Sequence, residues 1–139
     1  MTLDRIFFDA NLLFSLAWGS PGLARLGAWA QKRKCLLFAS QYVIEEVRRN
    51  LGDTEQIQRL DSFLTHVQVI PEVDPHIPCP IDLPEKDRPV LMAAISSRAD
   101  YFLTGDMTHF GEYFGKSVSG VKILRPRDYL NMRPAPQGK

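Results

Sequence analysis

Short apolar runs alternate along the chain with stretches of helical periodicity. The runs predict buried strands and lie at Arg5–Phe8, Cys35–Ala39, Val67–Ile70, Tyr101–Leu103 and Val121–Leu124. Between them, apolar residues recur at helical spacing behind Ser, Asp or Pro, which are preferred at helix starts. The helices are expected to begin at Ser20–Pro21, at Ser40, at Asp53 or Thr54, shortly before Val90, and at Pro126. Strands separated by helices predict a parallel sheet with helices on both faces.

The stretch from Pro71 to Pro89 interrupts this alternation. Its six prolines exclude a regular helix or an inner strand. A connection of this length is either an extended surface link or a functional loop, and the pattern leaves both open. It delivers Asp82, Glu85 and Asp87 to the start of the next helix, where an acid is also an ordinary N-terminal cap.

Two carboxylates stand at the ends of predicted buried strands. Asp9 closes the first apolar run, and Asp106 follows the run at Tyr101–Leu103 after the bend Thr104-Gly105. The carboxyl edge of an open α/β sheet is where ligands bind. Two anions held together there repel each other unless a cation lies between them.

A pair of glutamates, Glu45 and Glu46, lies in the helix that begins at Ser40. Neighbouring helix positions differ by about 100°, so both side chains flank the face opposite the core. A solvated face, with Arg48 and Arg49 as helical partners, is the plainer interpretation of this motif alone. The helical wheel does not choose between the two glutamates.

Composition narrows the function classes. The 139-residue chain favours one domain, expected over residues 1–132 with a frayed tail at 133–139. Its net charge of +1 means that a nucleic-acid contact must come from a local patch. The two cysteines have no metal-type spacing and indicate a reducing compartment. With no secretory signal or membrane-length apolar stretch, a cytoplasmic protein is expected.

Four segments in order resemble the PIN-domain nucleases. They are Phe7-Phe8-Asp9-Ala10-Asn11, Ile44-Glu45-Glu46-Val47, Lys86-Asp87-Arg88-Pro89-Val90-Leu91, and Ala99-Asp100-Tyr101-Phe102-Leu103-Thr104-Gly105-Asp106. The last segment is the most specific, and the resemblance runs from Ile6 to about Leu130. It implies a three-layer α/β/α sandwich with a four- or five-stranded parallel sheet and a cluster of acids at its carboxyl edge.

The resemblance also implies a set of site residues. The acids that would hold metal and serve catalysis are Asp9, Glu46, Asp87 and Asp106. Asn11 and Thr104 look like the polar residues that orient those acids or a water. Glu45 competes with Glu46 for the second position, and Asp82 and Glu85 surround the third.

The chemistry of these residues suits phosphodiester hydrolysis. Mg²⁺ and Mn²⁺ prefer oxygen ligands, and such ions neutralise a phosphate and activate water. The expected function is a Mg²⁺- or Mn²⁺-dependent ribonuclease acting on single-stranded RNA. The toxin of a toxin–antitoxin pair, with an antitoxin protein as partner, is one role that fits.

Basic side chains near the acids supply the substrate side of this hypothesis. Arg48, Lys86 and Arg88 could contact phosphates, which position a nucleic acid without reading its sequence. Solvated helix faces explain each of them singly. His109 could touch substrate, although an ordinary surface or helix-cap histidine is the plainer interpretation.

The sequence carries no RNA-stacking signature. Trp18 and Trp29 are expected in the core or at a subunit interface rather than as base platforms. A homodimer is expected, because symmetric dimers are the commonest soluble assemblies and the resemblance implies pairing. The apolar region of Trp18, Leu26 and Trp29 could supply its contact.

Two other functions stay open at this point. A PIN-like fold could bind RNA or a protein without catalysis. A receiver-like phosphoacceptor domain also gathers acids and Mg²⁺ at a parallel sheet's edge. It should show adjacent acids after the first strand and a lone aspartate after the third, whereas this chain has a single Asp9 and no such aspartate after Ile70.

Overall fold

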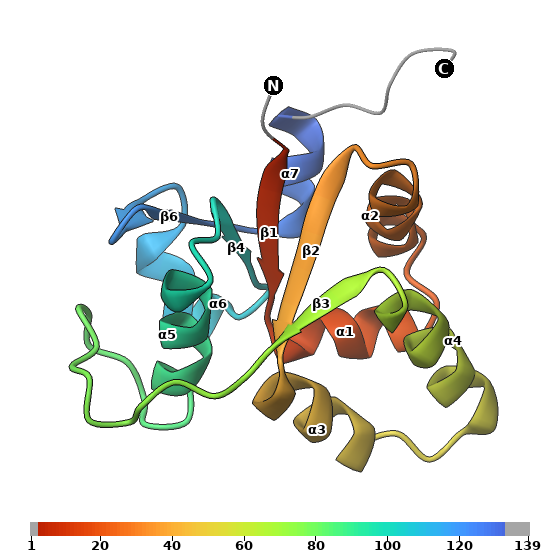
Figure 1. The fold of residues 1–139 in the computed structure, drawn as a ribbon, viewed down its shortest axis with the longest axis horizontal. Helices are drawn as coiled ribbons and strands as arrows, with labels where there is room; N and C mark the ends of the chain where they lie inside the picture. The colour runs from red at the N-terminus through yellow and green to blue at the C-terminus, as the bar shows by residue number, and fades with distance from the viewer. Residues whose placement is uncertain (1–2, 133–139) are drawn as a thin grey trace.

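A six-stranded sheet forms the centre of the computed structural model, which describes residues 3–132 (Figure 1). Its strands are β1 (Asp4–Phe8), β2 (Cys35–Ser40), β3 (Val67–Ile70), β4 (Tyr101–Leu103), β5 (Ser117–Val118) and β6 (Val121–Leu124). They stand in the order β3-β2-β1-β4-β6-β5, and only the β5–β6 pair is antiparallel. The five predicted strands and their parallel pairing are confirmed. The short edge strand β5 adds to them.

Helices lie on both sides of this sheet, so that the chain is a three-layer α/β/α sandwich. They are α1 (Ala10–Ala17), α2 (Pro21–Gln31), α3 (Gln41–Arg49), α4 (Thr54–Leu64), α5 (Arg88–Ser96), α6 (Met107–Phe110), the 3-10 turn η1 (Gly111–Tyr113) and α7 (Pro126–Met132). Ser20, Ser40 and Asp53 cap their helices as predicted, each side chain accepting a backbone N–H of the first turn.

Two helices have no counterpart in the sequence-based prediction. Helix α1 is nearly uniformly apolar and short, and α6 has only four residues, so neither shows a helical period. Each begins directly after an acid that caps it. Asp9 accepts the N–H of Ala10 at 2.8 Å, and Asp106 accepts the N–H of His109 at 3.1 Å. Both acids are therefore anchored where a strand turns into a helix.

Two of the three residues expected at a dimer contact are buried in the hydrophobic core. Helix α2 contacts β2 and carries Leu26, fully buried, and Trp29, only 7% exposed, into that core. Trp18 alone of the three is on the surface, at 62% exposure. The expected dimer contact is therefore wrong for Leu26 and Trp29, whose side chains pack inside the protomer.

The proline-rich connection between β3 and α5 contains no helix or strand, as predicted. Buried Leu83 attaches its last part to the core, just ahead of Asp87. None of the helices that the structure describes has the length and apolar character needed to cross a membrane. The predicted frayed tail lies outside the described residues.

Candidate functional site

A pocket of about 730 Å³ opens at the carboxyl edge of the sheet. Four carboxylates from separate parts of the sequence line it, namely Asp9, Glu46, Asp87 and Asp106. Asp9 follows β1, Glu46 lies in α3, and the other two stand at the starts of α5 and α6. The four sequence-predicted acids thus share one concave surface, the usual form of a ligand site.

Strand register brings the Asp9 and Thr104 positions together. In the parallel pair of β1 and β4, Phe8 is opposite Leu103, and the N–H of Asp9 donates to the Leu103 carbonyl at 3.1 Å. The residues that follow, Asp9 and Thr104, therefore leave the sheet side by side. This pairing of neighbouring strands positions the first acid beside the segment that carries the last one.

A hydrogen-bond network orients these groups. The Thr104 hydroxyl donates to Asp9 Oδ2 at 2.8 Å and accepts the N–H of Asp106 at 3.0 Å. The Asn11 amide donates to Asp9 Oδ2 and to Thr104 Oγ1, both at 3.2 Å. Its oxygen accepts the N–H of Gly105 at 2.9 Å. Asn11 and Thr104 therefore hold the acids in place.

Burial and neighbouring charges raise the pKa of two of these acids, Asp9 and Asp87. The pKa of Asp9 is raised from its ordinary 3.8 to about 6, mainly by burial and in smaller part by the charges of Asp87 and Asp106, while hydrogen bonds from Thr104 and Ala10 oppose the shift. Burial is also the main cause that raises the pKa of Asp87. His109 lowers it, and Asp106 and Glu46 raise it. The carboxylates are thus close enough to repel one another.

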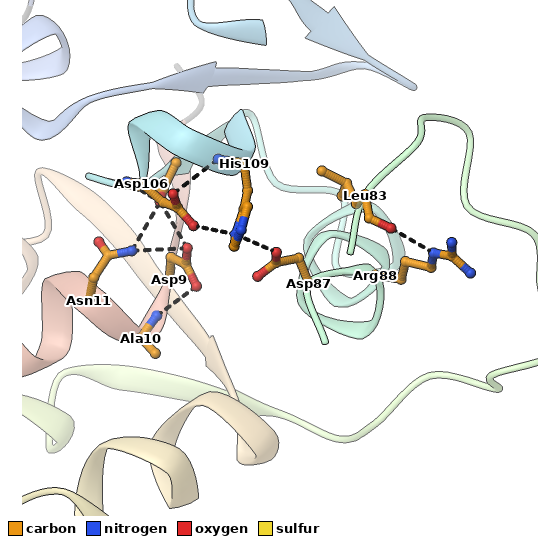
Figure 2. A network of polar contacts seen from close by, with 9 residues as sticks. Asp9, Ala10, Asn11, Leu83, Asp87, Arg88, Asp106 and His109 are labelled. Carbon is orange, nitrogen blue, oxygen red and sulfur yellow. Dashed lines mark hydrogen bonds and ion pairs between the residues drawn. The ribbon is translucent and has the colours of Figure 1, made fainter. Parts of the chain in front are cut away.

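His109 lies between two of these acids. Its Nδ1 atom is 2.8 Å from Asp87 Oδ2 and 2.8 Å from Asp106 Oδ2. Figure 2 shows the imidazole ring between the two carboxylates. The backbone of His109 does belong to a helix cap, but its ring reaches into the site, which the plainer interpretation of this residue did not predict.

Two buried atoms of this group have no hydrogen bond among the described residues. Asp87 Oδ2 and His109 Nδ1 are near enough to attract, yet the contact lacks hydrogen-bond geometry. Buried polar atoms in folded proteins are normally satisfied. We interpret the close contact as electrostatic and the two atoms as ready to bind a further group.

The donor set fits a divalent cation. Ligand atoms of Asp87, Asp106 and His109 all lie within 4.8 Å of one another. With metal–ligand bonds of about 2.1 Å, two ligands at right angles are about 3 Å apart, close to the observed contacts of His109 Nδ1. Carboxylates suit Mg²⁺ and Mn²⁺, and an imidazole favours a transition metal over Mg²⁺.

The structure separates the two candidate glutamates. Glu46 is partly buried and lines the pocket, whereas Glu45 is exposed and does not. The charge of Glu46 also contributes to the raised pKa of Asp87. Of the two glutamates, Glu46 is therefore the one that lines the pocket with the other acids.

The three basic residues that were expected to contact phosphates also differ in whether they line the pocket. Lys86 lines the pocket and lowers the pKa of Asp87. Arg48 is not among the lining residues and pairs with Asp61 of α4 at 2.8 Å. Arg88 donates through Nε to the Leu83 carbonyl at 3.0 Å and points away from the acids (Figure 2). Among the three expected phosphate contacts, Lys86 is the one at the pocket.

Sequence reasoning missed part of the lining. Phe14, Ser15 and Asn50 also face the pocket. Their signal is helical spacing, since Phe14 and Ser15 follow Asn11 by three and four positions and Asn50 follows Glu46 by four. That spacing becomes informative only once α1 is known to be a helix.

Comparisons with known proteins agree on the fold. By sequence, the chain matches no protein-family model and no curated protein. By structure, it is similar to a chain in the crystal structure of VapBC2 from Rickettsia felis, in which VapBC2 is bound to a DNA fragment from its promoter. The two share 13% identity with a TM-score of 0.61, over 87% of this chain and 98% of that one.

A second similar structure is PAE2754 from Pyrobaculum aerophilum. It shares 18% identity with a TM-score of 0.59, over 95% of this chain and 97% of that one. At such identities the likeness concerns the fold. The chain therefore shares the fold of these two structures, a three-layer α/β/α sandwich as the resemblance of its sequence segments implies.

Proposed function

We propose that the chain is a metal-dependent endoribonuclease that hydrolyses phosphodiester bonds of single-stranded RNA. The observation that carries this proposal is the convergence of four carboxylates from distant parts of the sequence on one pocket. Burial, together with the charges of Asp87 and Asp106, raises the pKa of Asp9 to about 6, and a bound cation would offset the free-energy cost of keeping this carboxylate ionised.

The residues at the pocket would serve three purposes, which are to bind the metal ion, to orient a carboxylate and to attract the phosphate. Asp87, Asp106 and His109, with Asp9 and Glu46 beside them, would hold Mg²⁺ or Mn²⁺. When bound, the ion neutralises phosphate charge and lowers the pKa of a water. Thr104 and Asn11 fix the Asp9 carboxylate, and Lys86 at the pocket attracts the phosphate of the RNA.

We also propose a cellular role as the toxin of a toxin–antitoxin pair in the cytoplasm. The structural likeness to a chain of VapBC2 supports this role. The partners would be RNA, an antitoxin protein and a second copy of this chain. Since Leu26 and Trp29 are in the core, a dimer would have to use another surface.

Cleavage of a labelled single-stranded RNA tests the nuclease directly. The RNA should be cut with Mg²⁺ or Mn²⁺ and stay intact with excess EDTA. Asp9→Asn should abolish cutting, because the neutral amide keeps the shape but lowers the charge that holds the metal. Glu72→Gln, a charge change at an exposed residue of the proline-rich connection, should leave cutting unchanged.

Circular dichroism of each variant shows whether its fold is intact. Equal cutting in EDTA, or full activity of a folded Asp9→Asn variant, would exclude the metal mechanism. RNA that is bound without being cut would favour the non-catalytic alternative.

A further inference from the structure

An aromatic surface continues from the acidic pocket along α1. Phe14 lines the pocket that contains the four acids. Trp18 follows it by four positions, one helical turn further along, and the two ring centroids are 6.1 Å apart with the planes tilted by 41°. The acidic pocket and the Trp18 ring are therefore joined by a continuous apolar contact.

Trp18 is held in place but left open. Its backbone N–H donates to the Phe14 carbonyl at 3.1 Å and ends α1, so the residue belongs to the folded frame. Yet its side chain is 62% exposed, while the other tryptophan, Trp29, is buried in the core. Tryptophan is enriched at interfaces, and this exposed indole packs against a residue that lines the pocket.

Polar groups border this aromatic surface. Ser15 of α1 and Asn50 of α3 line the same pocket as Phe14 and offer hydrogen-bonding groups. Arg59 of α4 donates through Nε to the Ala17 carbonyl at 2.7 Å, which fixes a half-exposed guanidinium beside the residue before Trp18. Single-stranded nucleic acids bind surfaces that combine aromatic rings with cationic side chains.

We propose that Phe14 and Trp18 form a stacking platform for an unpaired nucleobase of the RNA whose phosphate lies at the acids. The proposal rests on the nuclease function proposed above and names a substrate feature of that same site. Stacking on an aromatic ring accepts any base but requires that the base be free of a duplex. The platform would therefore make the site selective for single strands.

The position of Trp18 favours a nucleobase over a protein surface. A stable protein interface needs about 800 Å² on each partner. The two other apolar residues expected to widen this surface, Leu26 and Trp29, are inside the core. A single base needs only one or two accessible rings, and here exposed Trp18 contacts partly buried Phe14, which lines the acidic pocket.

Tryptophan fluorescence provides a direct test. The chain has two tryptophans, and because Trp29 is buried, quenching by a ligand in solution reports mainly on Trp18. A short single-stranded RNA is titrated into the protein with Ca²⁺, which binds carboxylate oxygens. Gel electrophoresis afterwards verifies that the RNA is intact. The same RNA as a duplex, and an abasic strand of equal length, serve as ligand controls.

Binding of the single strand should quench the fluorescence, and the duplex and the abasic strand should bind more weakly. Trp18→Ala should weaken binding of the single strand by about 5- to 150-fold, the range expected for loss of one stacked base. Trp18→Phe should restore most of the affinity. Ile77→Ala, which trims another exposed apolar side chain, should leave it unchanged.

Several results would overturn the platform. They are unchanged affinity in Trp18→Ala, equal affinity for the abasic strand, and absence of quenching on binding. A dimer in light scattering that Trp18→Ala converts to a monomer would also overturn it, because Trp18 would then belong to the dimer interface. Because the binding readout does not require cleavage, a protein that stacks RNA without cutting it would refute the nuclease and keep the platform. A protein that cuts RNA, and whose Trp18→Ala variant binds RNA as tightly as the wild type, would refute the platform and keep the nuclease.

Discussion

The Thr104 hydroxyl donates a 2.8 Å hydrogen bond to Asp9 Oδ2, joining residues 95 positions apart. The oxygen of the Thr104 hydroxyl also accepts the N–H of Asp106 at 3.0 Å. Thr104 is fully buried, so water cannot replace either bond. One hydroxyl thereby fixes the first proposed metal ligand against the backbone of the last.

Removing this hydroxyl should loosen the site. Thr104→Val keeps the shape but leaves the N–H of Asp106 without its acceptor, a loss of about 1–3 kcal/mol in the free energy of unfolding. Thr104→Ser keeps the oxygen and should cost less. Urea unfolding of both variants, beside RNA cleavage, measures the difference. Equal stability of the valine and serine variants would contradict the role given to this bond.

Stability without metal should depend on pH through Asp9. Its pKa rises from 3.8 in the unfolded chain to about 6 in the folded one, so the folded state holds the proton more tightly. The resulting stabilisation is complete below about pH 4 and is lost as pH rises through 6, by up to about 3 kcal/mol. The raised pKa of Asp87 acts with the same sign.

Urea unfolding in EDTA between about pH 4 and pH 7 measures this slope. Asp9→Asn should flatten it, because the amide does not titrate, and should leave the smaller part due to Asp87. A stability that rises with pH over this range, or a slope unchanged in Asp9→Asn, would show that Asp9 is not held in the crowded state described above.

The adjacent glutamates form a natural matched pair. Glu46→Gln should lower RNA cleavage by at least about tenfold, since it removes a charge from the pocket, whereas Glu45→Gln should have little effect at an exposed position. Both changes are isosteric and lie on the same helix, so effects on folding should be alike. A larger loss from Glu45→Gln would mean that the other glutamate is the functional one.

His109 should contribute directly to metal binding. His109→Phe removes Nδ1 from between Asp87 and Asp106 and should weaken Mn²⁺ binding by at least about 10–100-fold. His109→Asn keeps a polar atom near that place and should weaken it less. Calorimetry gives the affinities, and nitrogen coupling in the electron paramagnetic resonance spectrum of bound Mn²⁺ reports the imidazole. Absence of that coupling in the wild type would exclude His109 as a ligand.

The local sequence largely determined the secondary structure. Short apolar runs placed the five parallel strands, and Ser20, Ser40 and Asp53 marked helix starts. These signals are local, because caps and apolar periodicity act within a few residues of the backbone they order. Asp9, Asp87 and Asp106 were also open to prediction, since each follows a strand or stands at the start of a helix.

Tertiary structure decided what those acids face. Only strand register sets Asp9 beside Thr104, and only the tertiary fold brings Asp87, at the start of α5, close to His109 of α6. Helical periodicity left Glu45 and Glu46 equivalent, and the pocket distinguishes them. Trp18 and Trp29 have the same side chain, yet one lies in the core and one at the pocket's edge. Burial and charge proximity depend on residues far apart in sequence, and folding alone brings them within interaction range.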